Sequence, residues 1–371
     1  MLKKVALLIL VAIFIFALVG CAPAATPAAA PQPTSPPAAS QPTAPSATSQ
    51  PMTASAPLSL SSPASIVLIM SQPKGDPFGE LVYSGIERLQ KEVGNNLSIN
   101  LVESVDKAEY TDQVRSAAEG GANPVLVLWD DLANTVVQLA PSYPKTNFII
   151  IDSLVTANLP NVKTVVIQPT AAAFVAGVVA AETTKTKKIG FVGGADIPVI
   201  ENYYAGFAAG IKYVDPSIQI LEEYAGTFID PNKGLEVATN LFNQGADIVM
   251  HAANKTGLGV IQAAKQAGKK AIGVDMWQGD VAPGYVLWTA LKPADEATYL
   301  AAKEALSGNF QKGMWTYGPA QGATLYDKRD FDALSPDLQA IVTKVVEQIR
   351  SGAIVVPSTK KELASFNAKM Q

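Results

Sequence analysis

The stretch Lys188-Ile189-Gly190-Phe191-Val192-Gly193 decides the fold, because this short apolar run leads through a proline-containing loop into residues 203–213, which have helical period. A strand without polar alternation is buried on both faces, as in a parallel sheet. The same unit occurs earlier in the chain, where residues 66–70 lead through a loop into residues 81–93. Two such strand-loop-helix units predict two similar lobes.

Further units of this type fill both halves of the chain. Helices that cover both faces of parallel sheets make an α/β architecture, which is the fold class predicted here. Residues 334–349 have the pattern of an amphipathic helix. The other predicted strands are residues 99–102, 124–128, 148–152, 218–224, 247–251, 271–275 and 286–290, and the other predicted helices are residues 110–118, 132–139, 234–244 and 257–266.

The N-terminus has the pattern of an export signal. Lys3 and Lys4 precede an apolar run, residues 5–20, which ends at Cys21, the only cysteine. Leu18-Val19-Gly20-Cys21 resembles the processing site of bacterial lipoproteins, whose cysteine becomes an acylated N-terminus. We therefore predict a signal peptide at residues 1–20 and an extracytoplasmic protein, lipid-anchored to the bacterial cell membrane. A plain membrane span or an ordinary secretory signal is the alternative, although a span usually needs about 20 apolar residues.

The composition of the remaining chain limits both its structure and its partners. Residues 22–64 are almost only Ala, Pro, Thr, Ser and Gln without charge, which predicts a disordered tether over residues 21–64 and a bilobed domain over residues 65–371. A single cysteine excludes an intrachain disulfide, so packing must stabilise this domain. The net charge is −4 and no Lys/Arg run occurs, which argues against nucleic acid as a partner. No His/Cys/Asp cluster has metal-ligand spacing, and we expect no cofactor.

The run of residues 187–200, Lys-Lys-Ile-Gly-Phe-Val-Gly-Gly-Ala-Asp-Ile-Pro-Val-Ile, resembles the signature of the basic membrane protein (BMP) lipoproteins, the nucleoside-binding receptors of ABC importers. Residues 224–234, 243–247, 256–260 and 272–275 also match, so the resemblance covers most of residues 65–318. It implies a type I periplasmic-binding-protein fold, with two doubly wound parallel-sheet lobes joined by crossover strands. Lobe 1 would span about residues 65–175 plus part of 287–330, and lobe 2 about residues 176–286 plus the C-terminal helix.

Candidate binding residues lie directly after the predicted strands, because the carboxyl ends of parallel strands line the crevice of an α/β sheet. Trp129 could contact a ring or belong to the core, and its neighbour Asp130 could contact base edges. The helix that begins at Thr256-Gly257 could offer free backbone amides to ligand oxygens. It is not a dinucleotide fingerprint, because Gln262 stands where a third glycine is needed. The candidates after strands are Asp76, Phe78, Trp129, Asp130, Asp131, Phe228, Asn254 and Asp275.

The resemblance implies roles for four positions. Phe78 and Phe228 match aromatic residues that stack on the base, although each could instead be a buried loop anchor. Asp275 matches the acid that binds ribose hydroxyls, with a helix N-cap as the alternative. Lys292 matches a lysine that reaches the ligand, with a solvated lysine as the alternative.

Several departures from the family leave the ligand open. Gly79 stands where the family tends to have Asn after the stacking aromatic, and Asn254-Lys255 replaces a glycine pair. Leu258 replaces a polar residue, and Met276-Trp277 after Asp275 is bulkier than expected. A different base, a modified nucleoside or another small polar ligand is therefore compatible with the sequence.

Three functions compete. The first is a solute receptor that binds a nucleoside, a purine by preference, and delivers it to an ABC permease and ATPase complex. The second keeps the fold but binds a sugar, with Trp129 or Trp277 stacking on the ring and Asp275 and Asn254 taking hydroxyls. The third is an extracellular nucleoside hydrolase, which is disfavoured because the only histidine, His251, lies beside a strand end and because acylation would consume Cys21. Carboxylate dyads stay open.

Overall fold

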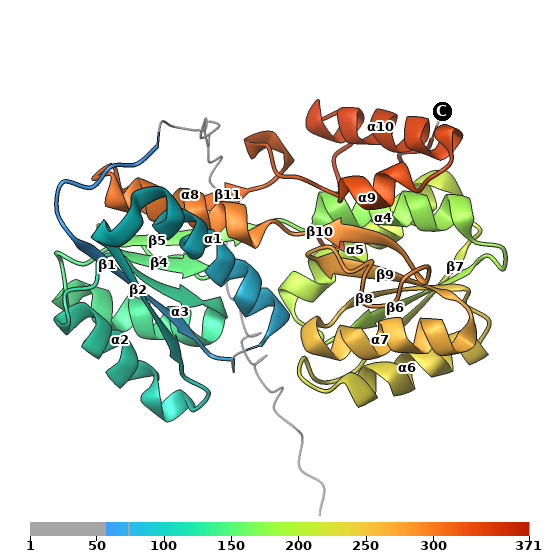
Figure 1. Ribbon diagram of the computed structural model, residues 1–371. Helices are drawn as coiled ribbons and strands as arrows, with labels where there is room; N and C mark the ends of the chain where they lie inside the picture. The colour runs from blue at the N-terminus through green and yellow to red at the C-terminus, as the bar shows by residue number, and fades with distance from the viewer. Residues whose placement is uncertain (1–56, 73–74, 371) are drawn as a thin grey trace, which may run out of the picture. The chain divides into compact units, whose positions relative to one another are not determined.

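A computed structural model of the chain describes residues 57–72 and 75–370, and these contain two parallel sheets (Figure 1). The first sheet has the strand order β11-β5-β4-β3-β1-β2 and the second has the order β10-β9-β8-β6-β7. All paired strands within both sheets run parallel. The strands are β1 (Ala64–Met70), β2 (Leu97–Glu103), β3 (Val125–Leu128), β4 (Phe148–Ile151), β5 (Val162–Ile167), β6 (Lys188–Gly193), β7 (Gln219–Tyr224), β8 (Ile248–Ala252), β9 (Lys270–Asp275), β10 (Val286–Leu291) and β11 (Gly313–Tyr317).

Helices cover both faces of each sheet, because alternate residues of a buried strand point to opposite faces. In the first sheet, Ile66 and Leu68 pack with α1 (Pro77–Val93) and α8 (Ala294–Leu306), whereas Val67 and Ile69 pack with α2 (Tyr110–Glu119) and α3 (Trp129–Leu139). We call this sheet and its four helices lobe 1. Lobe 2 is the second sheet with α4 (Thr170–Thr183), α5 (Pro198–Val214), α6 (Pro231–Asn243), α7 (Asn254–Ala267), α9 (Lys328–Asp332), α10 (Pro336–Arg350) and α11 (Lys360–Ser365).

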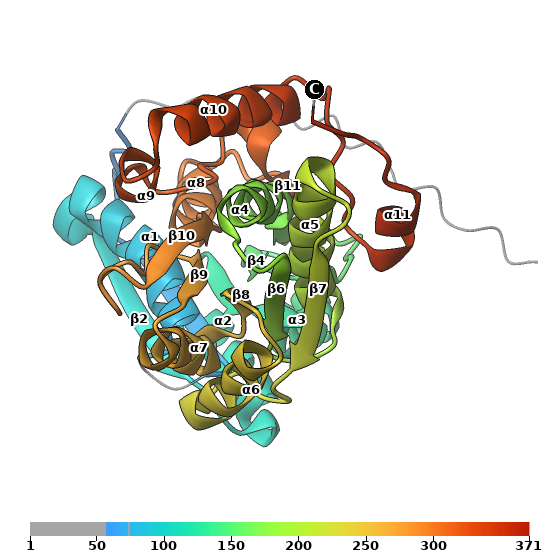
Figure 2. The ribbon, with the colours of Figure 1, turned by 90° about the vertical axis from the view of Figure 1, so that its right-hand side faces the viewer.

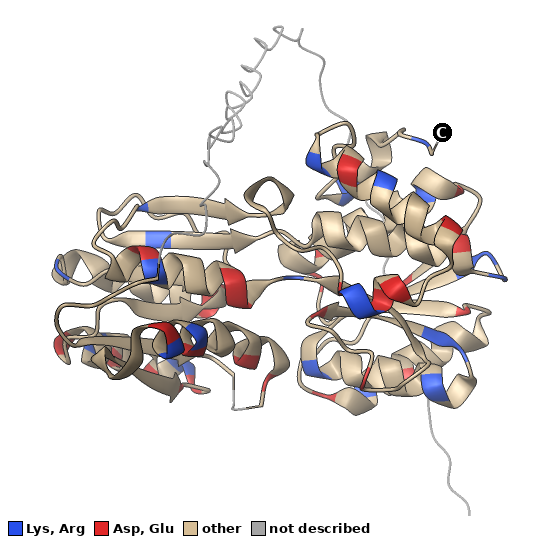
Figure 3. Ribbon diagram, turned by 45° about the horizontal axis from the view of Figure 1, so that its top comes forward, with Lys and Arg blue, Asp and Glu red and all other residues tan. Residues whose placement is uncertain are grey.

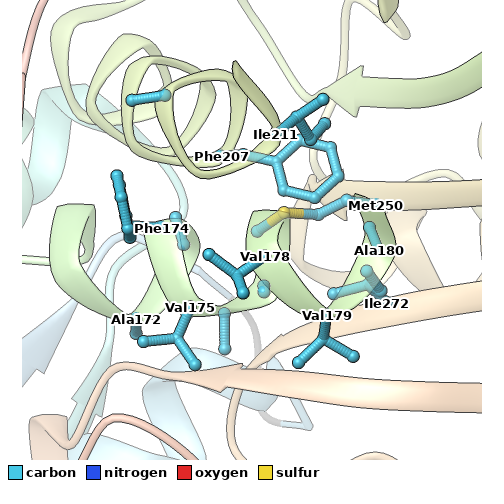
Figure 4. Packing of buried hydrophobic residues seen from close by; sticks show 14 of the residues in the cluster. Ala172, Phe174, Val175, Val178, Val179, Ala180, Phe207, Ile211, Met250 and Ile272 are labelled. Carbon is cyan, nitrogen blue, oxygen red and sulfur yellow. The ribbon is translucent and has the colours of Figure 1, made fainter. Parts of the chain in front are cut away.

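The largest core cluster of lobe 2 surrounds α4, which is apolar on all sides. Figure 4 shows Phe174 and Val178 of α4 with Phe207 of α5 and Met250 of β8 in this cluster. Helices α4 and α5 approach so closely that a β-carbon on Gly177 would lie 2.2 Å from the carbonyl oxygen of Phe207. Figure 2 shows α10 lying against α4, so the amphipathic helix predicted at residues 334–349 is confirmed as an outer layer.

The chain passes between the lobes three times, after β5, after β10 and after β11. These passages place segments of both lobes beside one another and join the two sheets at their carboxyl edges. Figure 3 shows acidic and basic residues interspersed over both lobes. Among the described residues, no helix is long and apolar enough to cross a membrane.

The end of the predicted tether belongs to the fold. Leu58 and Leu60 pack against the core of lobe 1, and the side chain of Asn96 donates a hydrogen bond to the carbonyl oxygen of Leu60. The expectation of disorder up to residue 64 is therefore wrong for residues 57–64, because these two leucines supply apolar surface that the preceding Ala/Pro/Ser/Thr segment lacks. The predicted signal, Cys21 and the rest of the tether lie outside the described residues.

Candidate functional site

One cavity of about 400 Å³ is lined by residues of both lobes, at the carboxyl ends of the two sheets. This volume is in the range of small-molecule sites in proteins. Its walls combine aromatic and aliphatic side chains with a few polar groups. The polar and aromatic lining residues are Gln72, Phe78, Trp129, Asp130, Asp131, Asp152, Ser153, Asn202, Tyr203, Phe228, Asn254, Asp275 and Lys292, and the aliphatic ones include Leu154, Val166, Ile167, Ile197, Val199, Ile200 and Val274.

Four non-glycine residues of the lining have left-handed backbone conformations. They are Trp129, Asp152, Asn254 and Asp275, with φ values of 61°, 56°, 47° and 69°. Each lies at, or within two residues of, the carboxyl end of a buried strand. Non-glycine residues in this region cost about 1–3 kcal/mol each and cluster at functional sites, where the surrounding structure holds them. These backbone conformations mark this edge of the two sheets as the candidate functional edge.

Asp275 is the carboxylate at the end of β9. It accepts a hydrogen bond of 2.5 Å from the hydroxyl of Tyr203, a residue of α5 that is 3% exposed. Burial raises the pKa of Asp275 to about 6, against the opposing influence of the Lys292 ammonium group and of the Tyr203 hydrogen bond. The pKa of Tyr203 is raised well above its usual value by burial and by the neighbouring carboxylates, so this phenol stays a donor.

Lys292 lies in the passage that leads from β10 to α8 and bridges the lobes. Its Nζ atom lies 2.6 Å from Oδ2 of Asp152, which comes directly after β4 in lobe 1. The two side chains are 3% and 7% exposed, so this ion pair is buried. The backbone N–H of Lys292 donates to the carbonyl oxygen of Asp275 at 3.0 Å in lobe 2. The interpretation of Lys292 as a solvated lysine is therefore wrong.

The aromatic side chains come from opposite lobes. Phe78 is only 4% exposed, since Trp129 stacks on it with ring centres 5.7 Å apart and the Lys292 ammonium lies 5.0 Å from its ring centre. Trp129 also lines the cavity and is half-buried, so it has more exposed surface than Phe78. Phe228, also half-buried, lies on Gly194, where a β-carbon would come within 2.2 Å of the ring. The geometry thus favours Trp129 over Phe78 as the ring that lobe 1 presents, with Phe78 as its buried support.

Asp76 and Asn254 connect the lobes at the start of α1 and α7. Oδ1 of Asp76 accepts the N–H of Gly79 at 2.9 Å and caps α1, while Oδ2 accepts Nδ2 of Asn254 at 2.5 Å. Asp76 is 3% exposed, and burial raises its pKa. Asn254 lines the cavity, and its Oδ1 atom is buried without a hydrogen-bond partner among the described residues. Asp76 is not itself among the lining residues; it positions Asn254.

Thr256 and Gly257 do not line the cavity. The N–H of Thr256 donates to the carbonyl oxygen of Phe228 at 3.1 Å, and the N–H of Gly257 donates to that of Ala253 at 3.3 Å. The hydroxyl of Thr256 also accepts the N–H of Asp230 at 3.0 Å. The prediction that these backbone amides are free to bind ligand oxygens is therefore wrong, because both N–H groups already donate to carbonyl oxygens of the protein. These residues hold the loop that carries Phe228.

His251, a residue of β8, is not among the cavity-lining residues and is fully buried, with Nε2 2.9 Å from Oε1 of Gln278. Burial lowers its pKa to about 4, so the ring is neutral at physiological pH. Trp277 also lies outside the lining, because its Nε1 donates to Asp330 at 2.9 Å and the Arg329 guanidinium lies 3.6 Å from its ring centre. Among the described residues, no group of three His, Cys, Asp or Glu side chains is arranged to hold a metal ion.

Sequence reasoning missed Tyr203, Asp152 and Ser153. Asp152 ends a predicted strand in the same way as the chosen Asp275, so the strand-end rule applied consistently would have found it. Ser153 donates to Asp130 at 2.5 Å and fixes one oxygen of that carboxylate. Tyr203 reaches the cavity from the side of a helix, and no local pattern indicates that.

Known proteins resemble this chain in sequence and in fold. Residues 64–360 match the family described as ABC transporter substrate-binding protein PnrA-like. The chain is 30% identical over 305 residues to basic membrane protein D of Borreliella burgdorferi, covering 79% of this chain and 87% of that protein. It is 29% identical over 317 residues to the ABC transporter nucleoside-binding protein BmpA of Lactococcus lactis, covering 80% and 89%. A solute-binding protein of an ABC transporter system from Aeropyrum pernix superposes with a TM-score of 0.72 at 22% identity, covering 82% and 96%. The predicted fold class is confirmed.

Proposed function

Because the chain belongs to the PnrA-like family of ABC transporter substrate-binding proteins, we propose that it binds a nucleoside between its lobes and delivers it to an ABC permease. The resemblance carried by residues 187–200 is thereby confirmed, and the family is one of transport proteins rather than enzymes. Nucleoside binding is supported by the name of the Lactococcus lactis relative, a nucleoside-binding protein. A purine is the base we favour.

The observation that carries the proposal is the pairing of two ring faces with one carboxylate. Trp129 from lobe 1 and Phe228 from lobe 2 line the same cavity as Asp275. A planar base can stack on such rings, at about 1–3 kcal/mol for each platform. A carboxylate can accept ribose hydroxyls, at about 1.5–3 kcal/mol per hydrogen bond. Binding from both walls would also favour a closed arrangement of the lobes, which a permease can recognise.

We further propose that the protein works outside the cytoplasmic membrane, held by a lipid on Cys21 after removal of residues 1–20. The apolar run that ends in Leu18-Val19-Gly20-Cys21 supports this. Mass spectrometry of the mature protein from bacterial membranes tests it: the expected species starts at Cys21 with attached acyl chains. A mature N-terminus at another residue would contradict it.

Calorimetry with purine and pyrimidine nucleosides, and with free ribose as competitor, tests the ligand. We expect dissociation constants of micromolar or tighter for a nucleoside, about −8 kcal/mol at 1 μM, and no competition by ribose. Trp129→Leu should weaken binding by roughly 5- to 150-fold, the equivalent of one lost stack. Trp277→Leu is the matched control, since that ring lies outside the cavity lining and should leave affinity unchanged.

Two outcomes would redirect the proposal. Displacement of a bound nucleoside by free ribose would favour the sugar-binding alternative. Free base after incubation of the protein with nucleosides would indicate a hydrolase, since a receptor returns its ligand unchanged.

A further inference from the structure

We infer that the C-terminal strap, residues 353–370, positions one wall of the cavity from outside through its contacts with the first turn of α5. The lining residues at this turn and directly before it are Ile197, Pro198, Val199, Ile200, Asn202 and Tyr203. No residue of the strap, all of which the structure describes, lines the cavity. The inference rests on the proposed function and adds to it a positioning residue, Lys360, that lies outside the binding site.

Backbone groups of the strap bind two polar side chains of this turn. The N–H of Lys360 donates to Oε1 of Glu201 at 2.7 Å. The side-chain amide nitrogen of Asn202, a lining residue, donates to the carbonyl oxygen of Ser358 at 2.6 Å. The next residue, Tyr203, holds the carboxylate at the end of β9 through its hydroxyl. The strap therefore contacts the turn immediately beside the residues that face the ligand space.

The side chain of Lys360 joins the strap to α5 and to β7. Its Nζ atom lies 2.7 Å from Oε1 of Glu222, 5.1 Å from the ring centre of Tyr204 and 5.7 Å from that of Tyr224. The same Oε1 atom accepts the hydroxyl of Tyr224 at 2.5 Å. Cation–π attraction adds to the charge pairing here, so this contact is stronger than an exposed ion pair alone. Because Tyr204 follows Tyr203 on the helix, Lys360 holds the strap directly behind the cavity wall.

The rest of the strap packs on lobe 2 and reaches the other end of α5. Leu363 of α11 is 6% exposed in the core of lobe 2, and Phe366 packs edge-on against Phe174 of α4 with ring centres 6.0 Å apart. The N–H of Met370 donates to the carbonyl oxygen of Tyr213, in the last turn of α5, at 2.9 Å. Figure 2 shows α11 lying beside α5. The strap thus contacts α5 at both of its ends, and a close-packed helix held in this way cannot shift alone.

Detachment of the strap would change affinity without removing any side chain from the cavity. Polar groups of a binding site must stay within a fraction of an ångström of their productive positions, and a small displacement of the wall weakens the contacts made there. The measured affinity falls with the fraction of molecules whose wall is in place. A folded protein with a loosened strap should therefore bind its ligand more weakly.

The experiment uses the full chain with the double substitution Lys360→Met/Leu363→Ala, which removes the ammonium contacts and the buried leucine of α11. Lys328→Met/Leu241→Ala is the matched control, because it makes the same exchanges at an exposed ion pair of α9 and in the buried core beneath α6. Both variants should lose stability in urea denaturation, since each loses a buried leucine. Only the strap variant should lose affinity in calorimetry, by roughly 3- to 30-fold for whichever of adenosine, guanosine and inosine binds wild type most tightly.

Two further measurements separate positioning from stability. In hydrogen exchange on the ligand-free proteins, the amides of residues 202–205 should exchange at least about tenfold faster in the strap variant than in the control. Lys360→Arg keeps a cation for the carboxylate and the two rings, and it should bind the nucleoside within about twofold of wild type. Should the double variant fail to fold, Lys360→Met with Lys328→Met as its control makes the same comparison.

The outcomes separate this inference from the proposed function. Equal loss of affinity in the strap variant and in the control would show a general effect of lower stability and overturn the inference. Wild-type affinity in the strap variant would overturn it as well, whether or not exchange in the first turn of α5 becomes faster, because the strap would then not position the wall. Failure of the wild-type chain to bind any nucleoside would instead contradict the proposed function, and the exchange comparison alone would then decide whether the strap holds the wall.

Discussion

Replacement of Asp275 by Asn should make the ligand-free protein more stable at neutral pH. The half-buried carboxylate lies against Tyr203 in the cavity wall, and its pKa of about 6 lies above the ordinary 3.8. A carboxyl group whose pKa is raised in the folded state favours folding below its unfolded pKa, and this contribution is lost as the pH rises through the folded pKa. The ionised form therefore destabilises the native protein above pH 6.

The size of the effect comes from the displacement of the pKa. Each pKa unit corresponds to about 1.36 kcal/mol, so a rise of about two units amounts to at most about 3 kcal/mol at pH 7.5. Asn keeps the shape and an oxygen for the Tyr203 hydroxyl but cannot ionise. The stability difference, variant minus wild type, should be smallest near pH 4, should grow through pH 6 and should level off at about 2–3 kcal/mol.

Urea denaturation of both ligand-free proteins at a series of pH values from 4 to 8 measures this difference, because comparison with wild type cancels the other titrating groups. The protein must first be unfolded and refolded to remove any bound ligand, which would add stability of its own. The same substitution should weaken nucleoside binding by roughly 10- to 150-fold, the equivalent of one charged hydrogen bond. A stability difference independent of pH, or a variant less stable than wild type at pH 7.5, would refute the reasoning.

Three further substitutions test other contacts. Gly194→Ala should weaken nucleoside binding by about tenfold in calorimetry, with little change in the folded fraction. The new methyl group would lie 2.2 Å from the Phe228 ring and displace it. Unchanged affinity would mean that the base does not stack on this ring. Lys292→Met should lower the free energy of unfolding by about 3–5 kcal/mol, since it leaves the Asp152 carboxylate buried and unpaired. Adding Asp152→Asn to this variant should recover most of the lost stability. Gly257→Ala should lower the free energy of unfolding by about 1–3 kcal/mol in urea denaturation, because its methyl group would lie 2.0 Å from Nδ1 of the buried His251 ring. An unchanged free energy of unfolding would show that the ring can move aside.

The architecture was predictable because buried parallel strands lack polar alternation and their helices are amphipathic. The strand that opens lobe 2, β6 (Lys188–Gly193), and the helix after it fit this pattern. Helix α4 was not predicted, because it is apolar on every side and its sequence therefore shows no amphipathic helical period. Strands β5 and β11 were not predicted either. They pair with each other although they are far apart in the sequence, and the local sequence pattern does not show which strands pair.

The candidate site was predictable where a residue lies at the end of a strand or within two residues of it, as for Asp275 and Asn254. The site was not predictable where the position or hydrogen bonding of a residue depends on residues that are distant in the sequence. Whether the amides at Thr256 are free depends on the Phe228 loop folding over them, which only the three-dimensional structure shows. Tyr203 depends in the same way on the angle at which α5 crosses the sheet. The roles of all these residues in binding stay predictions.

The hydrogen bond between Asp76 and Asn254 joins the first turns of two helices that belong to different lobes. Any separation of the two lobes would have to break this bond, and their return would have to remake it. We therefore expect this bond to govern how long a captured molecule resides before release, with a smaller effect on how tightly it is held at equilibrium. If the proposed delivery to a permease holds, slow release of the ligand would limit uptake, and a substitution at Asp76 or Asn254 could change the rate of uptake without changing which ligand is bound.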